Sequence, residues 1–398
     1  MPAPLLLDLS HTSHSRARTG IQRVTRSLSV ALADGAIPIT HDPHRKIWRK
    51  LDAWERTNLT ASDAAGRRSA KWPLRVRLHA HTDRFLRRNK TALPDNSGIL
   101  CPEVFSPAVG RALPELFASA HGPRVALFHD AIALKLPELT PPATVARFPR
   151  YLMELLAFDG IAAVSEDSRT SLLEYWAWLG VAKAPPVRAI PLGILPRQLS
   201  SIGEISPAES IPQVLSIGSI EGRKNHAALL DACEQLWERG ERFSLRLIGL
   251  AHPKTGAAAL TKLRALQAAG RPIRYDGPVS DAEVDAAYAR CTFSVYPSIM
   301  EGFGLPVIES LAHGKPCICS ARGALGESAQ GGGCIGLQTM DAASLGAAIE
   351  QLIRSPDQIA ALSAQARARR FKTWDRYADE LRAWIFNLAA APRSERFA

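Results

Sequence analysis

Two carboxylates eight residues apart flank a glycine-rich turn in the second half of the sequence. Glu301 follows a predicted strand that ends at Tyr296, and Glu309 lies inside the helix predicted next. Gly302 and Gly304 let the backbone approach a ligand closely, and free amides at a helix N-terminus suit a phosphate. Because each carboxylate can accept two hydroxyl hydrogen bonds, the turn favours a phosphorylated polyol as ligand. The candidate residues of this turn are Glu301, Gly302, Phe303, Gly304, Leu305 and Glu309.

A second polar loop, which begins at Gly218, also follows a predicted strand and precedes a predicted helix. It carries Arg223 and Lys224 side by side at the helix start, where cations oppose the helix dipole and so do not serve helix stability. A bound diphosphate would explain them, because Arg forks onto phosphate oxygens and Lys adds a point charge. Each loop alone is also compatible with a solvated turn. Two such loops after strands of one parallel sheet favour a shared site, with Gly218, Arg223 and Lys224 as further candidates.

The first half of the chain offers fewer candidates. His129 and Asp130 end a predicted buried strand, where an imidazole can donate a hydrogen bond to a hydroxyl; a histidine satisfied within the core is the alternative. Gly20 opens the first predicted helix and would let amides approach phosphates. The sequence contains no P-loop, nucleophile elbow, zinc-protease motif or Asp-x-Asp pair. If Arg223 and Lys224 neutralise a diphosphate, a divalent metal is unnecessary, and we expect none.

Strands and helices alternate along both halves, which predicts two α/β domains with doubly wound parallel sheets. A length of 398 residues also fits two domains. We place the N-terminal domain at 1–200, the C-terminal domain at 205–370 and a last segment at 371–398, with 356–391 as a closing helix. Because ligands bind at the carboxyl ends of strands in such sheets, we expect the candidate loops to line a cleft between facing domains.

Positive charge is concentrated in one segment. The formal net charge is +11, and residues 44–90 contain fourteen Lys/Arg and four Asp/Glu, a local balance of +10. Residues 41–95 show no clear periodicity, and we interpret them as a basic insertion. Such a segment attracts an anionic membrane surface or a diphosphate-linked ligand, and a solvated insertion is the alternative. No aromatic-basic RNA signature accompanies it, so we expect no nucleic-acid partner.

The six cysteines are scattered, and a chain of this length buries a core without disulfides. We therefore expect reduced thiols and a cytoplasmic protein. No stretch approaches the roughly 20 apolar residues of a membrane-spanning helix. Cys317 and Cys319 are spaced C-x-C, but partners at zinc-finger spacing are missing. We interpret them as small residues on a buried strand rather than as a metal site.

The motifs resemble those of family 4 of the retaining glycosyltransferases, which have the GT-B fold of two Rossmann-like domains. Residues 301–309 resemble the family's E-x7-E signature, and residues 217–225 resemble its diphosphate-binding loop. The resemblance covers most of 120–325. Residues 19–24, together with His129 and Asp130, are similar to the bacterial mannosyltransferase-like branch that builds polysaccharide or O-antigen.

The resemblance implies a metal-independent, retaining transfer of a hexose, with mannose favoured, from a GDP- or UDP-linked donor and with no cofactor. The acceptor would be a glycan or a polyprenyl-diphosphate-linked molecule, which places the protein at the inner face of the cell membrane. Arg223 and Lys224 would bind the donor diphosphate, and Glu309 the ribose. Glu301 would contact the sugar, with amides from 302–305 around sugar and phosphate.

The resemblance also assigns roles to the N-terminal domain, which would bind the acceptor. His129 would face the reacting sugar, with Asp130 beside it in the sequence, and Gly20 would lie near the phosphates. The helix in 371–398 would cross back to this domain. The chain departs from the family at Gly326-Glu327, where Pro-Glu is frequent, and in the run 331–333 of three glycines. Both departures leave the identity of the sugar open.

Two other function classes remain to be weighed. A nucleotide-sugar epimerase or hydrolase on the same fold would need no acceptor. A basic protein that binds nucleic acid or an anionic surface without catalysis would rely on 44–90. The second alternative gives no role to Arg223, Lys224, Glu301 or Glu309. We favour the transferase because patterns in both halves fit one site.

Overall fold

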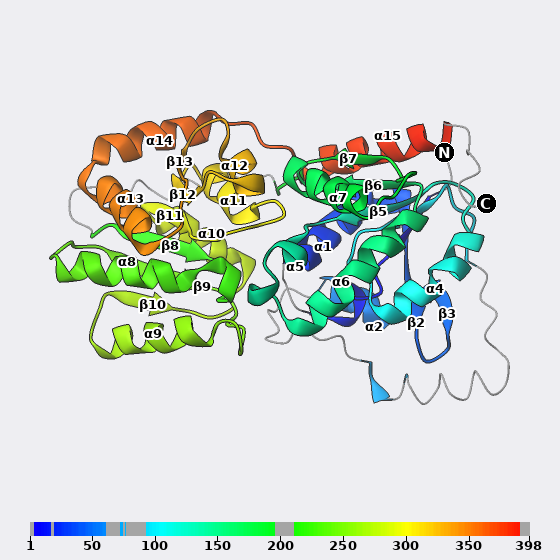
Figure 1. The fold of residues 1–398 in the computed structure, drawn as a ribbon, viewed down its shortest axis with the longest axis horizontal. Coiled ribbons are helices and arrows are strands. Elements are labelled where there is room, and N and C mark those ends of the chain that lie inside the picture. Colours follow the sequence, from blue (N-terminus) through cyan, green and yellow to red (C-terminus); the bar gives the residue numbers. More distant parts are fainter. Residues whose placement is uncertain are drawn as a thin grey trace. The chain divides into compact units, whose positions relative to one another are not determined.

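The computed structural model describes residues 4–16, 20–60, 72–74, 76, 93–195 and 211–390. It divides into two compact units (Figure 1). Unit 1 comprises Met1–Asp130, Arg147–Gly193 and Trp374–Ala398, and unit 2 comprises Ala131–Ala146 and Ile194–Thr373. The segment expected to be the N-terminal domain, 1–200, therefore includes sixteen residues, 131–146, that group with unit 2. Most of the basic insertion lies outside the described residues.

Unit 1 is built on a seven-stranded sheet in the order β3-β2-β1-β4-β5-β6-β7. Neighbouring strands are parallel except β2 and β3. The strands are β1 (Leu5–Asp8), β2 (Ala36–Asp42), β3 (Ile47–Lys50), β4 (Ile99–Cys101), β5 (Arg124–Phe128), β6 (Gly160–Ala163) and β7 (Val187–Ala189). The helices are α1 (Gly20–Leu32), α2 (Ala53–Thr60), α4 (Pro107–Ala118), α6 (Pro142–Glu154), α7 (Glu166–Trp178) and α15 (Trp374–Ala390), with short 3-10 turns η1 (Thr12–His14), η2 (Ala33–Gly35) and η4 (Leu155–Ala157). The segment 131–146, which groups with unit 2, contains α5 (Ile132–Lys135), η3 (Pro137–Leu139) and the beginning of α6.

Unit 2 contains a six-stranded, wholly parallel sheet in the order β10-β9-β8-β11-β12-β13. The strands are β8 (Gln213–Ile217), β9 (Ser244–Ile248), β10 (Ile273–Tyr275), β11 (Phe293–Tyr296), β12 (Cys317–Ser320) and β13 (Cys334–Leu337). The helices are η5 (Gly222–Lys224), α8 (His226–Glu238), α9 (Ala257–Ala268), α10 (Asp281–Arg290), α11 (Leu305–Ala312), α12 (Gly323–Ala329), α13 (Ala342–Arg354) and α14 (Pro356–Ala368). The two parallel sheets confirm the predicted α/β class.

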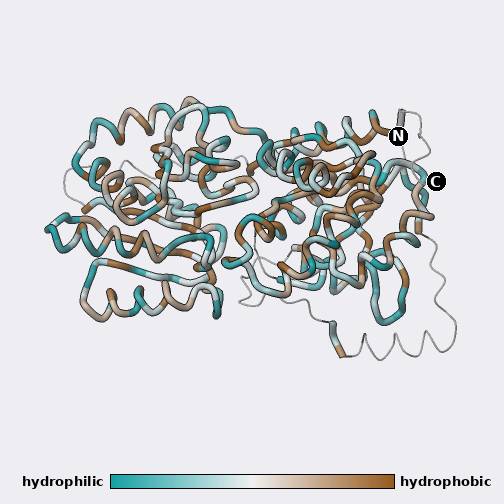
Figure 2. Tube along the Cα trace, viewed as in Figure 1, coloured by the Kyte–Doolittle hydropathy of each residue, from teal (hydrophilic) through white to brown (hydrophobic). Residues whose placement is uncertain are grey.

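The apolar pattern explains why these segments fold as they do. All of β1 is buried, as expected for a central strand covered on both faces. In α1, Val24, Leu28 and Leu32 are four residues apart and are buried, so this helix presents one apolar stripe to the sheet. A capping box begins α10, with Ser280 and Glu283 each bonded to the other's backbone amide. Figure 2 shows the surface helices alternating between hydrophilic and hydrophobic turns.

The closing helical segment expected at 356–391 consists of two helices, α14 and α15, separated by a segment in which Thr373 pairs with Ile194. α15 lies within 371–398, where a C-terminal helix is expected, and packs against α1 and β6 of unit 1. The start of the basic segment, for which the sequence shows no clear periodicity, contains β3 and α2. Among the described residues, none of the helices combines the length and the apolar character needed to span a membrane.

Candidate functional site

The strand order of unit 2 reverses between β8 and β11, and the two polar loops identified in the sequence follow these two strands. Such a reversal is where ligands bind at the carboxyl edge of a parallel sheet. The Ile299 amide donates to the Arg223 carbonyl at 2.9 Å, N to O. The Ser298 hydroxyl donates to the same carbonyl at 3.3 Å. The two loops are therefore joined directly, as the sequence analysis expected.

Both cations of the first loop bind Glu301 of the second. Glu301 Oε1 lies 2.6 Å from Arg223 Nη1 and 2.5 Å from Lys224 Nζ. The Ser298 hydroxyl donates to the same oxygen, and the Lys224 ammonium donates to the Tyr296 hydroxyl. Burial opposes ionisation of Glu301, but the charges of Arg223 and Lys224 outweigh it and lower its pKa to about 2. Glu301 is therefore a carboxylate at neutral pH.

Lys224 is buried and Arg223 is partly buried, and their pKa values are shifted in opposite directions. Burial lowers the pKa of Lys224 although Glu301 favours its charged form. Arg223 keeps its charge because Glu301 and Glu221 raise its pKa against the effect of burial. Glu221 Oε1 lies 3.1 Å from Arg223 Nη2. Two cations and two carboxylates thus cancel, so an added diphosphate would compete with Glu301 for the same hydrogen-bond donors.

The glycine turn after Glu301 leads directly into α11. Gly304 precedes the helix with φ of 98°, a left-handed conformation that disfavours any residue with a side chain. A Cβ on Gly304 would also lie 2.9 Å from Leu325 Cδ2. The Phe303 carbonyl accepts a hydrogen bond from the Ser328 hydroxyl, which fixes the turn on α12. Glu309, one helical turn beyond Leu305, is buried on α11.

Gly218 directly follows β8 and lies beside Lys224. A Cβ at this position would lie 3.6 Å from Tyr296 Cε2 and 3.9 Å from Lys224 Cδ. A larger side chain would therefore enter the space next to Lys224. The Lys224 ammonium lies 4.7 Å from the centroid of the Tyr296 ring, within the range of a cation–π contact. Tyr296 is thus a second partner of Lys224 that sequence reasoning did not identify.

In unit 1, His129 and Asp130 directly follow β5, as predicted. His129 is buried, and its Nε2 donates to the Pro102 carbonyl at 2.7 Å. Burial lowers its pKa and favours the neutral ring. With the proton on Nε2, neutral His129 presents an acceptor at Nδ1, and its donation to a ligand hydroxyl stays a prediction. Gly20 is the first residue of α1, and a Cβ there would meet open space.

The strand order of unit 1 also reverses, between β1 and β4, and buried carboxylates lie at that point. Glu103, after β4, accepts the amides of His11 and Thr12 at 2.9 Å each. Asp8 ends β1 and accepts the Ser10 amide at 3.0 Å. Burial, reinforced by the charge of Glu103, raises the pKa of Asp8 to about 7. This edge of unit 1 thus presents carboxylates where unit 2 presents cations.

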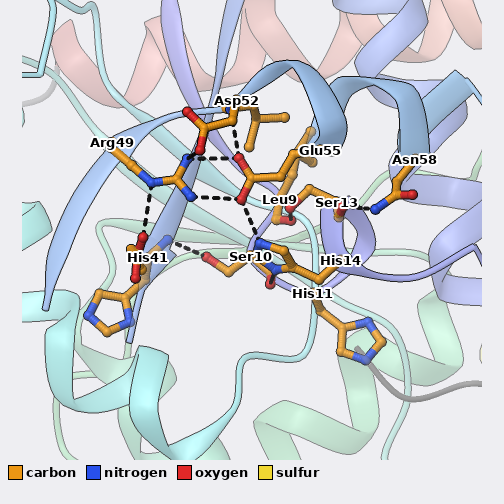
Figure 3. A network of polar contacts seen from close by, with 12 residues as sticks. Leu9, Ser10, His11, Ser13, His14, His41, Arg49, Asp52, Glu55 and Asn58 are labelled. Carbon is orange, nitrogen blue, oxygen red and sulfur yellow. Dashed lines mark hydrogen bonds and ion pairs between the residues drawn. The ribbon is translucent and has the colours of Figure 1, made fainter. Parts of the chain in front are cut away.

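A buried ionic network holds the loop that follows β1 (Figure 3). Glu55 of α2 is at its centre and receives Arg49 Nη1 at 2.7 Å and His14 Nε2 at 2.7 Å. Arg49 Nε also lies 3.2 Å from Asp42 Oδ2. Burial opposes ionisation of Glu55, but hydrogen bonds from His14 and Arg49 lower its pKa to about 2. Two strands, one helix and the turn η1 are therefore fixed to one another by charge.

The two loops lie in a part of the chain that matches a known protein family. Residues 202–369, which include all the candidate residues of unit 2, match the model of the family described as glycosyl transferases group 1. This part of the chain is similar to group 1 glycosyl transferases. This match, together with the relatives described next, confirms the resemblance found in the sequence.

Two relatives of this chain come from Escherichia coli. Serotype-specific mannosyltransferase WbdA is 26% identical over 328 residues, which cover 79% of this chain and 38% of that protein. O-antigen chain mannosyltransferase B is 31% identical over 209 residues, which cover 49% of this chain and 52% of that protein. The chain therefore spans less than two thirds of the length of these relatives.

Solved structures agree with the fold of this chain. A sucrose-phosphate synthase from Thermosynechococcus elongatus has a TM-score of 0.71 at 19% identity, over 98% of this chain and 99% of that one. HepE from Anabaena, in complex with UDP and glucose, has a TM-score of 0.67 at 14% identity, over 96% of this chain and 99% of that one. At these identities the likeness concerns the fold alone, and it confirms the predicted GT-B class.

We expect Asp8→Asn to stabilise the protein increasingly as the pH rises. The folded pKa of about 7 lies above the ordinary value of 3.8, so the folded state favours protonated Asp8. That stabilising contribution is complete below pH 3.8 and is lost as the pH rises to about 7. Asparagine is neutral throughout and can still accept from Ser10, so we expect a gain on the order of 2–4 kcal/mol at pH 8 over pH 4.

The measurement is urea unfolding of both proteins between pH 4 and pH 8. Asp34→Asn, which removes an exposed carboxylate from the same unit, is the control and should leave stability nearly unchanged. An Asp8→Asn effect of the same size at both ends of this range would contradict the assignment of a raised pKa to Asp8.

Proposed function

We propose that this protein is a retaining glycosyltransferase that transfers a hexose from a nucleotide diphosphate sugar to a glycan or lipid-linked acceptor. The main support is the buried cluster of Arg223, Lys224 and Glu301 at the carboxyl edge of the unit 2 sheet. Mannose is the favoured sugar because two relatives are named mannosyltransferases. UDP, present in the HepE structure, and GDP are the candidate nucleotides. The relatives' names suggest a role in O-antigen or other surface polysaccharide synthesis.

In the proposed complex, Arg223 and Lys224 neutralise the donor diphosphate. Arg223 offers a planar fork of donors for phosphate oxygens, and Lys224 offers a compact charge. Amides from Gly302 to Leu305 at the start of α11 add partial positive charge. Glu309 holds the ribose. With two cations and these amides at the diphosphate, the reaction needs no divalent metal.

Glu301 changes partners in this mechanism. Once the phosphates occupy Arg223 and Lys224, the Glu301 carboxylate is released to accept hydrogen bonds from hydroxyls of the donor sugar. The acceptor hydroxyl then attacks the anomeric carbon from the side on which the carbon–oxygen bond to the diphosphate breaks, so the configuration is retained. The hydroxyl proton passes to the leaving phosphate oxygen, whose developing charge the two cations stabilise.

Replacement of both cations, Arg223→Ala/Lys224→Ala, should abolish nucleotide binding. Calorimetric titration with UDP, GDP, ADP and CDP in EDTA should show one preferred nucleotide for the native chain. Each hydrogen bond to a charged group contributes about 1.5–3 kcal/mol, so the double variant should bind that nucleotide at least roughly 100-fold more weakly.

The matched control is Arg239→Ala/Lys254→Ala, which removes two exposed cations from the same unit. This variant should bind the nucleotide like the native chain. If the folded native protein bound none of the four nucleotides, the transferase proposal would fail, and binding by segment 44–90 to an anionic surface would become the better explanation.

Glu301→Gln should tighten the binding of the free nucleoside diphosphate while slowing transfer. The substitution keeps the shape but removes the charge that competes for Arg223 and Lys224, so we expect roughly 10-fold tighter binding. Because the glutamine amide is a weaker acceptor for sugar hydroxyls, turnover should fall by roughly 100-fold. Calorimetry gives the affinity, and nucleotide release that depends on added acceptor gives the turnover.

The control for this variant is Glu238→Gln, an exposed carboxylate at the end of α8. It should change neither quantity. Weaker nucleotide binding by Glu301→Gln would show that Glu301 organises the cations instead of competing for them, and the proposed exchange of partners would be wrong.

A further inference from the structure

Three of the six cysteines gather on one face of the unit 2 sheet. Cys317 and Cys319 are two residues apart on β12, so their side chains share a face. Cys334, the first residue of β13, is the direct partner of Cys317 in the parallel ladder. The three thiols lie close enough to shift one another's pKa. The strand predicted for Cys317 and Cys319 is confirmed, but its thiols have a third partner that the sequence did not reveal.

The geometry between the two strands suits a disulfide. Neighbouring strands lie about 4.8 Å apart, and disulfides join Cα atoms about 4.4–6.8 Å apart. Cys317 and Cys334 face each other directly, whereas Cys319 is paired with Gly336. Cys317 is therefore the better placed partner for Cys334.

Cys334 differs from the other cysteines in exposure and in charge environment. It is half-buried, whereas the remaining five are buried. The contacts with Cys317 and Cys319, helped by the Arg369 guanidinium, lower the pKa of Cys334 to about 4. A thiolate that solvent can reach is the form that reacts with peroxides.

The backbone before Cys334 is held in an unusual conformation. Gly331, Gly332 and Gly333 have φ values of 91°, 90° and 81°, which only glycine adopts readily. Arg369 Nη1 donates to the Gly332 carbonyl at 3.2 Å, and Gln365 Oε1 accepts the Gly333 amide at 2.9 Å. This glycine run, which departs from the family pattern, thus brings Cys334 into β13 next to Arg369.

The thiols are connected through Tyr296 to the ionic cluster of Arg223, Lys224 and Glu301, called the cation cluster below. Cys319 is paired with Tyr296 in the ladder between β12 and β11, and both belong to one buried cluster with Cys317. Tyr296 is the residue whose hydroxyl accepts from Lys224. A change in the packing of the thiols therefore reaches Lys224 through one intervening side chain.

A second route joins the thiols to the glycine turn. Arg369 donates to the Ser328 carbonyl at 3.1 Å, and the Ser328 hydroxyl donates to the Phe303 carbonyl. Loss of negative charge at Cys334 would remove an attraction that helps hold Arg369 at this position.

We propose that Cys334 and Cys317 are a peroxide-sensitive thiol pair whose oxidation to a disulfide weakens donor binding at the cation cluster. The Cys334 thiolate attacks a peroxide oxygen and becomes a sulfenic acid as hydroxide leaves. The Cys317 thiol then attacks that sulfur, the sulfur–sulfur bond forms, and water leaves. In sum, two thiols and one hydrogen peroxide give one disulfide and two waters.

The test begins with peptide mapping of the full chain after exposure to hydrogen peroxide, unfolding and alkylation of the remaining thiols. The expected product is a bridge between Cys334 and the peptide that contains Cys317, reversed by dithiothreitol, with Cys101, Cys233 and Cys291 alkylated. Cys319→Ser should form the same bridge. Cys317→Ser should stop at a sulfenic acid on Cys334, which dimedone traps. Alkylation of both Cys317 and Cys334 after peroxide would overturn the proposal.

The second measurement is calorimetry with the nucleoside diphosphate that the reduced native chain prefers, and this part rests on the proposed function. Oxidised native protein should bind it roughly 5-fold or more weakly, and Cys334→Ser should bind it equally well with or without peroxide treatment. Unchanged affinity in a chain with the mapped bridge would overturn the coupling to the donor site. Absence of nucleotide binding by the reduced chain would instead count against the proposed function, because the mapping needs no nucleotide.

Discussion

The candidate site of unit 2 depends on one largely buried carboxylate, Glu301, that faces the buried Lys224 and the partly buried Arg223. Removing Arg223 and Lys224 from water is costly unless an opposite charge compensates them. Glu301 supplies that charge and so joins the loop after β8 to the loop after β11. A ligand that carries two negative charges can take over the same compensation. The ion pairs of Glu301 therefore hold the two loops together. In the proposed function, the same hydrogen-bond donors also bind the anion, so the carboxylate and the ligand compete for them.

The two units use one topological feature with opposite electrostatics. In each sheet the strand order reverses once, and polar loops follow the strands on either side of that point. In unit 1 the Glu103 carboxylate already accepts two loop amides, the groups that would otherwise bind an anion. Asp8 lies at the same edge and adds a second acidic group. Negative groups there disfavour a phosphate, whereas Arg223 and Lys224 in unit 2 favour one.

The sequence indicated which two loops of unit 2 come together, those after β8 and β11, because the residues that mark each loop are close together in the chain. Glu301, Gly304 and Glu309 lie within one short segment, and Arg223 and Lys224 are adjacent, so spacing along the chain was enough to identify them. The partner that the sequence did not identify, Tyr296, acts from a strand that reads as ordinary core. Its hydroxyl has a role only because the sheet order places β11 beside β8.

The beginning of the basic segment shows why other contacts could not be predicted. Arg49 and Glu55 look like members of a solvated charge run, yet both are buried and paired with each other. β3 is a four-residue antiparallel edge strand, too short to show a period. Glu103 meets Thr12 across 91 residues, a pairing set by the parallel neighbours β1 and β4 and not by any local pattern.

A buried apolar cluster joins the thiols of β12 to the loops after β8 and β11. Through it, a change at the thiols can displace these loops. Val307 and Leu311 of α11, Leu325 of α12 and Tyr296 of β11 pack with the cysteines of β12 in one buried cluster. Interiors of this kind are close-packed and transmit small displacements instead of absorbing them. The Gly304 turn has little room to adjust, because its left-handed backbone lies against Leu325 and Ser328. The proposed disulfide between β12 and β13 would change the packing beneath the Gly304 turn. The same close packing that fixes the positions of the loops would therefore also transmit a change at the thiols to them.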